Sequence, residues 1–215
     1  MNSLSGFFFR AALIAVVLAL WYWTQKLIKR KASTGEKIGD LLHELSGPQN
    51  AWLNAHPRAA NAILIVASAF IDLFGLYLFG SSLLGATIRP FLALVVLFAL
   101  RQLCQGLCTL PAPKGIIWRH PGFPSLLVTY DVGNDFFFSG HTAIAVLAVL
   151  ELGRAGPPWL VAAAGLIAVF EVVTVIVLRA HYLVDVFAAA FVAWGCESAA
   201  SRFAPAIDVW LHRLF

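Results

Sequence analysis

The chain has 215 residues, of which 60% are hydrophobic and only 12% are charged. Because soluble domains carry about 25% charged residues, this composition excludes an ordinary soluble protein and indicates a membrane protein. The net charge is +4, but no stripe interleaves basic with stacking residues, so we expect no nucleic-acid partner. The three cysteines form no CxxC pair and are interpreted as small buried residues.

Six apolar stretches are long enough to span, or nearly span, a bilayer, which needs about 20 helical residues. Ala and Leu dominate these stretches, so helices are favoured over a β-barrel. The predicted fold is therefore all-α, an integral membrane bundle of six transmembrane helices. In chain order the stretches are 11–27, 59–84, 90–107, 136–152, 159–178 and 182–200.

The N-terminal part is predicted to be an anchor followed by an interfacial segment. Lys29-Arg30-Lys31 follows the first stretch without a small-residue cleavage site, which is typical of a retained anchor rather than a signal peptide. The polar region 29–58 contains "IGDLLHELSGPQNAWL", whose near-helical apolar spacing predicts a segment in the interface plane. Residues 1–58 thus precede a five-helix remainder, 59–215, in a single domain overall. The Pro- and Gly-rich segment 109–134 is predicted to be an irregular loop.

Counting spans places two polar motifs on one membrane face. The third stretch ends on the face where the fourth begins, at "SGHT", Ser139 to Thr142. The fifth stretch returns the chain to that same face, where "RAHYLVDV" begins at Arg179. The two motifs are therefore expected to share one face, although they lie far apart in the sequence.

The residue types in these motifs suit chemistry on a phosphate. His181 and Asp185 are four residues apart, so on a helix they would lie on one face, one turn apart. The carboxylate can hold one ring nitrogen as a donor and leave the other as a nucleophile or base. Arg179 offers a planar cation suited to phosphate. His141 opens the fourth helix, with Ser139 as its predicted N-cap, and the free N–H groups of a helix start attract an anion.

Together these groups favour phosphoryl transfer through a phospho-histidine, in which one histidine attacks phosphorus and the other protonates the departing alkoxide. Two interpretations compete with this one. The His/Asp pair and the Ser-Gly-His cap can be purely structural, and two histidines with a carboxylate can ligate a metal, although no HExxH accompanies them. The remaining histidines are expected to be ordinary interface residues: His43, His56, His120 and His212.

Three ionisable residues lie deeper in the predicted spans: Asp72, Arg101 and Glu171. Each costs at least about 2.5 kcal/mol when it faces lipid near the bilayer centre, so each is expected to face the bundle interior. Either acid can pair with Arg101 as a structural ion pair. The functional alternative is that Arg101 borders a headgroup pocket.

These motifs resemble those of a known family. "SGHT" with "HYLVDV" is similar to the sphingomyelin synthases and to the plant phosphatidylcholine:diacylglycerol cholinephosphotransferases, within the wider superfamily of type 2 phosphatidic-acid phosphatases. Upstream, "RQLCQGLCTLPAP" resembles the family segment in which an Arg precedes a TLP-x-P turn. "GNDFFFSGHT" places Asp135 on the acidic position that precedes SGHT in the family. The resemblance covers residues 101–193.

The resemblance implies a six-helix core and a site that uses no metal and no other cofactor. In it His181 would be the nucleophile on phosphorus, Asp185 its orienting base, and His141 the acid for the leaving lipid alkoxide. The expected phosphate and headgroup contacts are Arg101, Asp135, Ser139, Gly140, Arg179 and Tyr182.

We therefore predict a membrane enzyme that moves phosphocholine or phosphoethanolamine from a glycerophospholipid donor to a lipid-alcohol acceptor, ceramide or diacylglycerol. Ser82 and Val175 stand where the phosphatase branch carries a Lys and an Arg, which favours the synthase branch. The alternatives are a lipid phosphate phosphatase that uses water as acceptor and a non-catalytic transporter or scaffold. The sequence sets no oligomeric state, and a homo-oligomer is compatible with it.

Charge also bears on the side of the membrane that the site faces. Ten of the fifteen Lys and Arg residues lie on the face of the predicted site. Because basic residues favour the cytoplasmic side, this count predicts a cytoplasmic-facing site in a multi-pass membrane protein. The resemblance implies the opposite face, since the sphingomyelin synthases act on the outer or lumenal side.

Overall fold

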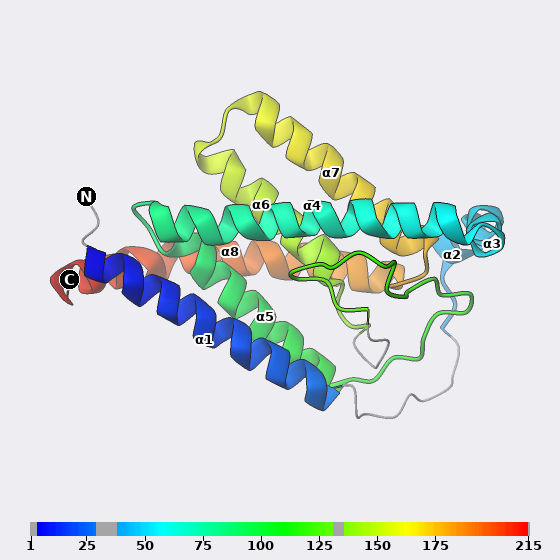
Figure 1. Ribbon diagram of the computed structural model, residues 1–215, viewed down its shortest axis with the longest axis horizontal. Coiled ribbons are helices and arrows are strands. Elements are labelled where there is room, and N and C mark those ends of the chain that lie inside the picture. The colour runs from blue at the N-terminus through cyan, green and yellow to red at the C-terminus, as the bar shows by residue number, and fades with distance from the viewer. Residues whose placement is uncertain (1–3, 29–37, 131–135, 215) are drawn as a thin grey trace.

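The computed structural model describes residues 4–28, 38–130 and 136–214, which form helices and no strands (Figure 1). Each of the six predicted stretches corresponds to a helix. Most ends agree to within four residues, but α1 begins at Leu4, seven residues before its predicted stretch, and α8 ends at Leu214, fourteen residues after its own. Two further short helices occupy the polar region. In chain order the helices are α1 (Leu4–Ile28), α2 (Leu41–Leu45), α3 (Gly47–Ala55), α4 (Pro57–Leu84), α5 (Arg89–Leu107), α6 (Gly140–Ala155), α7 (Pro158–Val177) and α8 (Leu183–Leu214).

Within the described ranges, five helices are long and apolar enough to cross a membrane: α1, α4, α5, α7 and α8. The fold is therefore an all-helical, multi-pass membrane bundle. The predicted count of six spans is not confirmed. The sixth helix, α6, has 16 residues, and a helix of that length extends about 24 Å, less than the roughly 30 Å of a bilayer's hydrocarbon core.

Helix α6 lies at the centre of the bundle, against α4, α7 and α8 (Figure 1). Small residues dominate its buried surface, and Ala143, Ala145 and Ala148 are at most 1% exposed. Alanine at such positions lets neighbouring helices approach closely, which is how helices pack within membranes. The short helix is thus enclosed by longer ones, and its N-terminus is held at a fixed place inside the protein.

Two carboxylates buried in the half of the bundle away from SGHT are paired with arginines. Arg89 on α5 donates to both carboxylate oxygens of Glu151 on α6, with its shortest N–O distance at 2.8 Å. Arg154 at the end of α6 pairs with Glu197 on α8. Because an unpaired charge in this environment is costly, these pairs fix how α6 sits between α5 and α8.

Part of the segment between α5 and α6 docks on the side of α4. Figure 1 shows this segment beside α4 and α8. Asp72, midway along α4, accepts hydrogen bonds at 2.9 Å from the Ser125 hydroxyl and from the backbone N–H groups of Leu126 and Leu127. Asp72 therefore faces the interior as predicted, but it binds this loop and does not pair with Arg101. We call residues 125–129 the re-entrant loop.

Leu127 anchors the re-entrant loop in the core. Its side chain is 6% exposed and packs among Ile71, Phe74 and Leu97. It fills the space beside Gly75, where an added Cβ would lie 2.1 Å from the Leu127 Cδ1 atom. A glycine at position 75 therefore lets the Leu127 side chain lie against α4, and a larger residue there would force that side chain to shift.

The polar region ends against the start of α8. Asp40 caps α2, because its Oδ1 accepts from the N–H groups of Leu42 and His43 at 2.9 and 3.2 Å. Its Oδ2 accepts from the Leu183 N–H at 2.6 Å. One carboxylate thus caps two helices and ties the polar region to the turn that precedes α8.

Candidate active site

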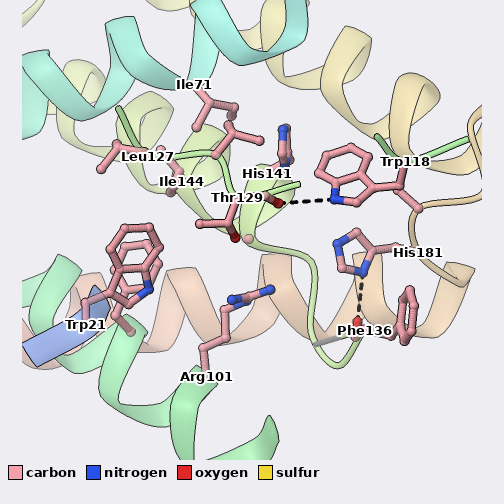
Figure 2. A pocket seen from close by; sticks show the side chains of 14 residues that line it. Trp21, Ile71, Arg101, Trp118, Leu127, Thr129, Phe136, His141, Ile144 and His181 are labelled. Atoms are coloured by element: carbon pink, nitrogen blue, oxygen red, sulfur yellow. Dashed lines mark hydrogen bonds between the residues drawn. The ribbon is translucent and has the colours of Figure 1, made fainter. Parts of the chain in front are cut away.

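One pocket gathers His141, His181 and Arg101, which come from three different parts of the chain (Figure 2). Its volume is about 40 Å³, which is room for one or a few water molecules and too little for a lipid headgroup. The pocket as it stands therefore does not accommodate a lipid headgroup. The lining residues are Trp21, Ile71, Phe98, Arg101, Trp118, Leu127, Val128, Thr129, Phe136, Gly140, His141, Ile144, Ala180 and His181.

His181 lies in the turn between α7 and α8 and not on a helix. The sequence predicted that His181 and Asp185 share a helical face, but α7 ends at Val177 and α8 begins at Leu183. The Nδ1 atom of His181 lies 2.7 Å from the Phe136 carbonyl oxygen. Since a carbonyl only accepts, this contact requires a proton on Nδ1 and leaves the Nε2 lone pair available as a nucleophile.

Asp185 is fully buried and acts first as a helix cap. Its Oδ2 accepts a hydrogen bond from the Tyr182 N–H at 2.9 Å, as in a capping box. The same oxygen lies 3.7 Å from the His181 Nδ1 atom, which is too long for a hydrogen bond but close enough to attract a charged ring. The Asp185 carbonyl accepts from the Ser139 N–H at 3.2 Å, which joins the two motifs directly.

His141 is the second residue of α6, and its ring is 7% exposed. Its Nε2 is buried and has no hydrogen-bond partner among the described residues. The Trp118 ring meets the His141 ring edge-on at 5.2 Å, and Trp118 donates through Nε1 to the Thr129 carbonyl at 3.2 Å. The re-entrant loop therefore holds the indole that covers one side of His141 (Figure 2).

Arg101 brings a positive charge to the N-terminus of α6. Its Nε donates to the Phe138 carbonyl at 2.9 Å. A Cβ added at Gly140 would lie 3.4 Å from that Nε, so glycine lets the guanidinium approach the helix start closely. Ser139 caps the helix, because its hydroxyl accepts from the Thr142 N–H at 3.3 Å. A guanidinium beside a helix N-terminus forms an anion site.

Several predicted headgroup contacts lie elsewhere. Arg179, with φ +56°, donates to the Lys114 carbonyl at 2.5 Å and to the His43 carbonyl at 2.8 Å, and it does not line the pocket. Arg179 thus joins two loops, and its predicted contact with the phosphate stays a prediction. Ser139 and Tyr182 do not line the pocket either, and Asp135 lies outside the described residues.

Tyr182 contacts the loop that follows α5, and its predicted headgroup contact stays a prediction. Its hydroxyl donates to the Pro111 carbonyl at 3.0 Å. Burial raises the pKa of Tyr182, and the negative charges of Asp185 and Asp40 raise it further. The hydroxyl therefore stays protonated at neutral pH and remains a donor to the loop.

Glu171 on α7 faces the interior as predicted, since it is 0% exposed. Neither of its carboxylate oxygens has a hydrogen-bond partner in the part of the chain that the structure describes. It does not line the pocket, so the predicted pairing with Arg101 is not observed. No chemistry at the site depends on it.

Several residues that complete the pocket were not predicted from the sequence. Trp118, Thr129 and the Phe136 carbonyl reach the histidines only through tertiary contacts of an irregular segment. Trp21 lies on α1, which the sequence predicted to be only an anchor. The signal that was available is aromatic content in an otherwise Pro- and Gly-rich loop, which is typical of a binding loop.

The arrangement offers the His181 Nε2 atom as a nucleophile. It also offers a His141 ring nitrogen that has no partner among the described residues, and the positive charge of Arg101 beside the start of α6. Among residues 4–28, 38–130 and 136–214, no group of three or more His, Cys, Asp or Glu side chains is placed to hold a metal ion.

The chain matches the model of the AtPDCT1/2 family over residues 40–202. The matched segment includes both histidines, Arg101 and Asp185, and it begins after α1. No curated protein and no solved structure matches the chain.

Proposed function

The chain belongs to the AtPDCT1/2 family, in which PDCT denotes phosphatidylcholine:diacylglycerol cholinephosphotransferase, and we propose that it transfers phosphocholine from a phosphatidylcholine donor to a diacylglycerol acceptor. The observation that carries this proposal is that His141, His181 and Arg101, all within the matched segment, line one pocket. We further propose that the reaction passes through a phospho-histidine.

In the first half-reaction, the donor phosphate binds between Arg101 and the N-terminus of α6. His181 attacks phosphorus through Nε2, the bond from phosphorus to the diacylglycerol oxygen breaks, and that oxygen takes a proton from His141. The ring of His181 becomes positively charged when it carries phosphocholine. Its Nδ1–H then donates to the Phe136 carbonyl, and the carboxylate of Asp185 at 3.7 Å offsets the charge.

In the second half-reaction, the hydroxyl of an incoming diacylglycerol gives its proton to His141 and attacks the same phosphorus. The bond between phosphorus and Nε2 breaks, so phosphatidylcholine leaves and both histidines return to their starting states. The leaving lipid of the first step and the acceptor of the second are the same kind of molecule. One binding site for the lipid part therefore serves both steps.

The walls of the pocket favour a lipid alcohol over water as acceptor. Ile71, Leu127 and Ile144 line it together with the indole of Trp118. Apolar walls exclude water from a reactive intermediate, which suppresses hydrolysis. A phosphatase activity and transfer to ceramide remain alternative outcomes of the assay below. Kinship with the sphingomyelin synthases and the wider phosphatidic-acid phosphatase superfamily is part of the proposal and rests on SGHT and HYLVDV.

We also propose that α6 is the sixth span of a single membrane domain, in which residues 1–58 precede the five helices that carry the site. Its two ends support this, because Gly140 lines the pocket while Glu151, near the C-terminal end of α6, pairs with Arg89, the first residue of α5. A short span is tolerated where longer helices surround it.

The assay uses the purified full chain in vesicles that contain headgroup-labelled phosphatidylcholine, with added diacylglycerol, with added ceramide, or with neither. We expect labelled phosphatidylcholine with the acyl chains of the added diacylglycerol, identified by mass spectrometry, and expect His181→Ala to form none. If free phosphocholine is the main product, the protein is a phosphatase and the proposed transferase activity is wrong. If no product forms in any mixture, both activities are rejected.

A further inference from the structure

The pocket continues into an apolar crevice between α1, α4 and α5. Trp21, Phe98 and Leu127 line both cavities, so the two are adjacent. Every side chain that lines the crevice is apolar or an indole. Beyond the three shared residues these are Val17, Leu18, Phe79, Phe91, Leu94 and Val95. The crevice follows α1 and α5 away from the histidines, toward the N-terminal end of each helix.

Trp21 stands at the junction of the pocket and the crevice. Its side chain is 8% exposed and meets the ring of Phe98 edge-on at 5.7 Å. Its Nε1–H is buried and has no acceptor among the residues that the structure describes. A buried donor without an acceptor is costly, so a ligand that supplies an acceptor here is favoured. Figure 2 shows Trp21 and His181 on opposite sides of the pocket, with Arg101 between them.

The chemistry changes in order along the combined cavity. The histidines and Arg101 come first, the indole N–H comes next, and apolar walls follow. A glycerophospholipid has its groups in the same order: a phosphate, then an ester carbonyl, then an acyl chain. The match of three successive environments to three successive groups identifies the class of ligand.

Helix α1 is the most loosely held of the five apolar helices. Only 11% of its apolar window is buried, against 28 to 39% for the others. It lies at the edge of the bundle, beside α5 (Figure 1). The crevice has a volume of about 20 Å³, too small for an acyl chain, so binding of a chain there would require α1 to move outward from α5.

We propose that α1 and α5 form the acyl-chain site for the diacylglycerol part of the lipid substrate, with the Trp21 Nε1–H donating to an ester carbonyl. This rests on the proposed function, because it takes the histidines as the place where the phosphate reacts. It extends beyond the family match, which covers residues 40–202 and does not include α1. The helix predicted to be an anchor is then part of the substrate site.

The first test is photo-crosslinking with a diacylglycerol that carries a diazirine in the middle of one acyl chain, in the absence of any donor. We expect crosslinks on α1 and α5 at the crevice residues, mapped by peptide mass spectrometry and abolished by excess unlabelled diacylglycerol. Crosslinks on lipid-facing surfaces should not be competed. Competed crosslinks that map to other helices would overturn the proposal.

Filling the crevice tests the same site in two independent ways. Leu18→Trp fills it from α1 and Val95→Phe from α5, and each should lose the competed crosslink. Leu20→Trp is the matched control, because Leu20 is 55% exposed, and it should keep the crosslink. Melting temperatures identify any variant that has not folded. If both filled variants melt like the wild type and keep the competed crosslink, the acyl-chain site is wrong.

The donor bond of Trp21 is tested with an ester-linked diacylglycerol and its ether-linked analogue, which lacks the carbonyl. With the wild-type protein, the ester-linked lipid should suppress the crosslink at about one-fifth of the concentration that the ether-linked lipid needs. One neutral hydrogen bond accounts for a difference of this size. With Trp21→Phe, the two lipids should compete equally well. Trp23→Phe, at a position 59% exposed, should retain the difference. An unchanged difference in Trp21→Phe would reject the role of the indole.

The two proposals fail separately. Crosslinking requires no turnover, so competed crosslinks in the crevice together with a silent transfer assay would reject only the proposed reaction. Normal transfer by folded Leu18→Trp and Val95→Phe, with crosslinks unchanged, would reject only the acyl-chain site.

Discussion

The Nδ1 atom of His181 lies 2.7 Å from the carbonyl oxygen of Phe136 and 3.7 Å from Oδ2 of Asp185. The backbone carbonyl therefore fixes the tautomer of the ring, and the carboxylate contributes mainly its charge. This division of roles differs from a His–Asp pair in which the carboxylate holds the ring directly. It also explains why Phe136, which supplies only a carbonyl to the ring, belongs to the site.

Asp185→Asn should lower kcat by about 10- to 100-fold, in the range found for groups that orient a histidine indirectly. The amide oxygen can still accept from the Tyr182 N–H, so the cap remains while the charge is lost. Steady-state transfer and the melting temperature should be measured together. Asp185→Ala is the control, since it loses the cap and should also melt lower. A loss near 10⁴-fold in Asp185→Asn with unchanged melting would show that the carboxylate holds the ring after all.

The two histidines should respond differently to an activated donor. His141→Ala removes a general acid, which typically contributes about 10²–10⁴-fold with a poor leaving group. A p-nitrophenyl phosphodiester of choline needs no proton on its leaving group, so its turnover by His141→Ala should lie much closer to that of the wild type. His181→Ala should gain nothing, because no nucleophile remains. Rescue of His181→Ala but not of His141→Ala would reverse the two roles.

Substitutions of the two arginines should have different effects, one on the reaction at the anion site and the other on the stability of the protein. Arg101→Gln should lower kcat/KM by about 10²-fold, as loss of one preorganised donor to a reacting oxyanion does. Arg179→Gln should lower the melting temperature, because two loop carbonyls lose their donor, while the KM for the donor lipid changes little. An Arg179→Gln variant with normal melting and a strongly raised KM would support the interpretation of Arg179 as a phosphate contact.

Because Gly75 and Leu127 are in contact, substitutions at these two positions should have non-additive effects on the free energy of unfolding. Gly75→Ala places a methyl group against Leu127 and should destabilise the protein by about 1–3 kcal/mol, the range for overpacking a core. Leu127→Ala leaves a cavity. The double variant should be more stable than the sum of the two changes predicts, because the added methyl group then occupies vacated space. Additive changes in thermal unfolding would show that the loop does not dock on α4 in solution.

Turnover should survive chelators, because the proposed steps use histidines as nucleophile and acid. The measurement is transfer after dialysis against EDTA, compared with an untreated sample. Loss of activity that zinc restores would favour the metal interpretation of the two histidines and Asp185.

The helices and the placement of the two motifs could be read from the sequence because both depend on local properties. Apolar composition indicates each helix, and Ser139 is an N-cap from its residue type alone. Counting helices then brings His141 and His181 to one side of the bundle, and they line one pocket. The helical spacing of His181 and Asp185 was misleading, because the chain turns at Arg179 before α8 begins.

The features that the sequence could not give depend on irregular backbone. Asp72 binds a loop more than fifty positions away, with two backbone N–H groups among its three donors, and no side-chain pattern indicates such a partner. The same holds for the Phe136 carbonyl beside His181. Arg179 has the residue type of a phosphate ligand, but the carbonyls within its reach decide its role. α6 could be located but not counted as a span, because it is short.

The ion pair between Arg89 and Glu151 has a consequence for biogenesis. Glu151 lies near the C-terminal end of α6, and its partner lies at the start of α5. A short helix with a carboxylate is poorly accepted into lipid by itself when it leaves the ribosome. The arginine that neutralises this carboxylate has already been synthesised when α6 emerges, so we expect α5 to assist the insertion of α6. The order of these two helices along the chain thus places the counterpart of Glu151 in the membrane before α6 needs it.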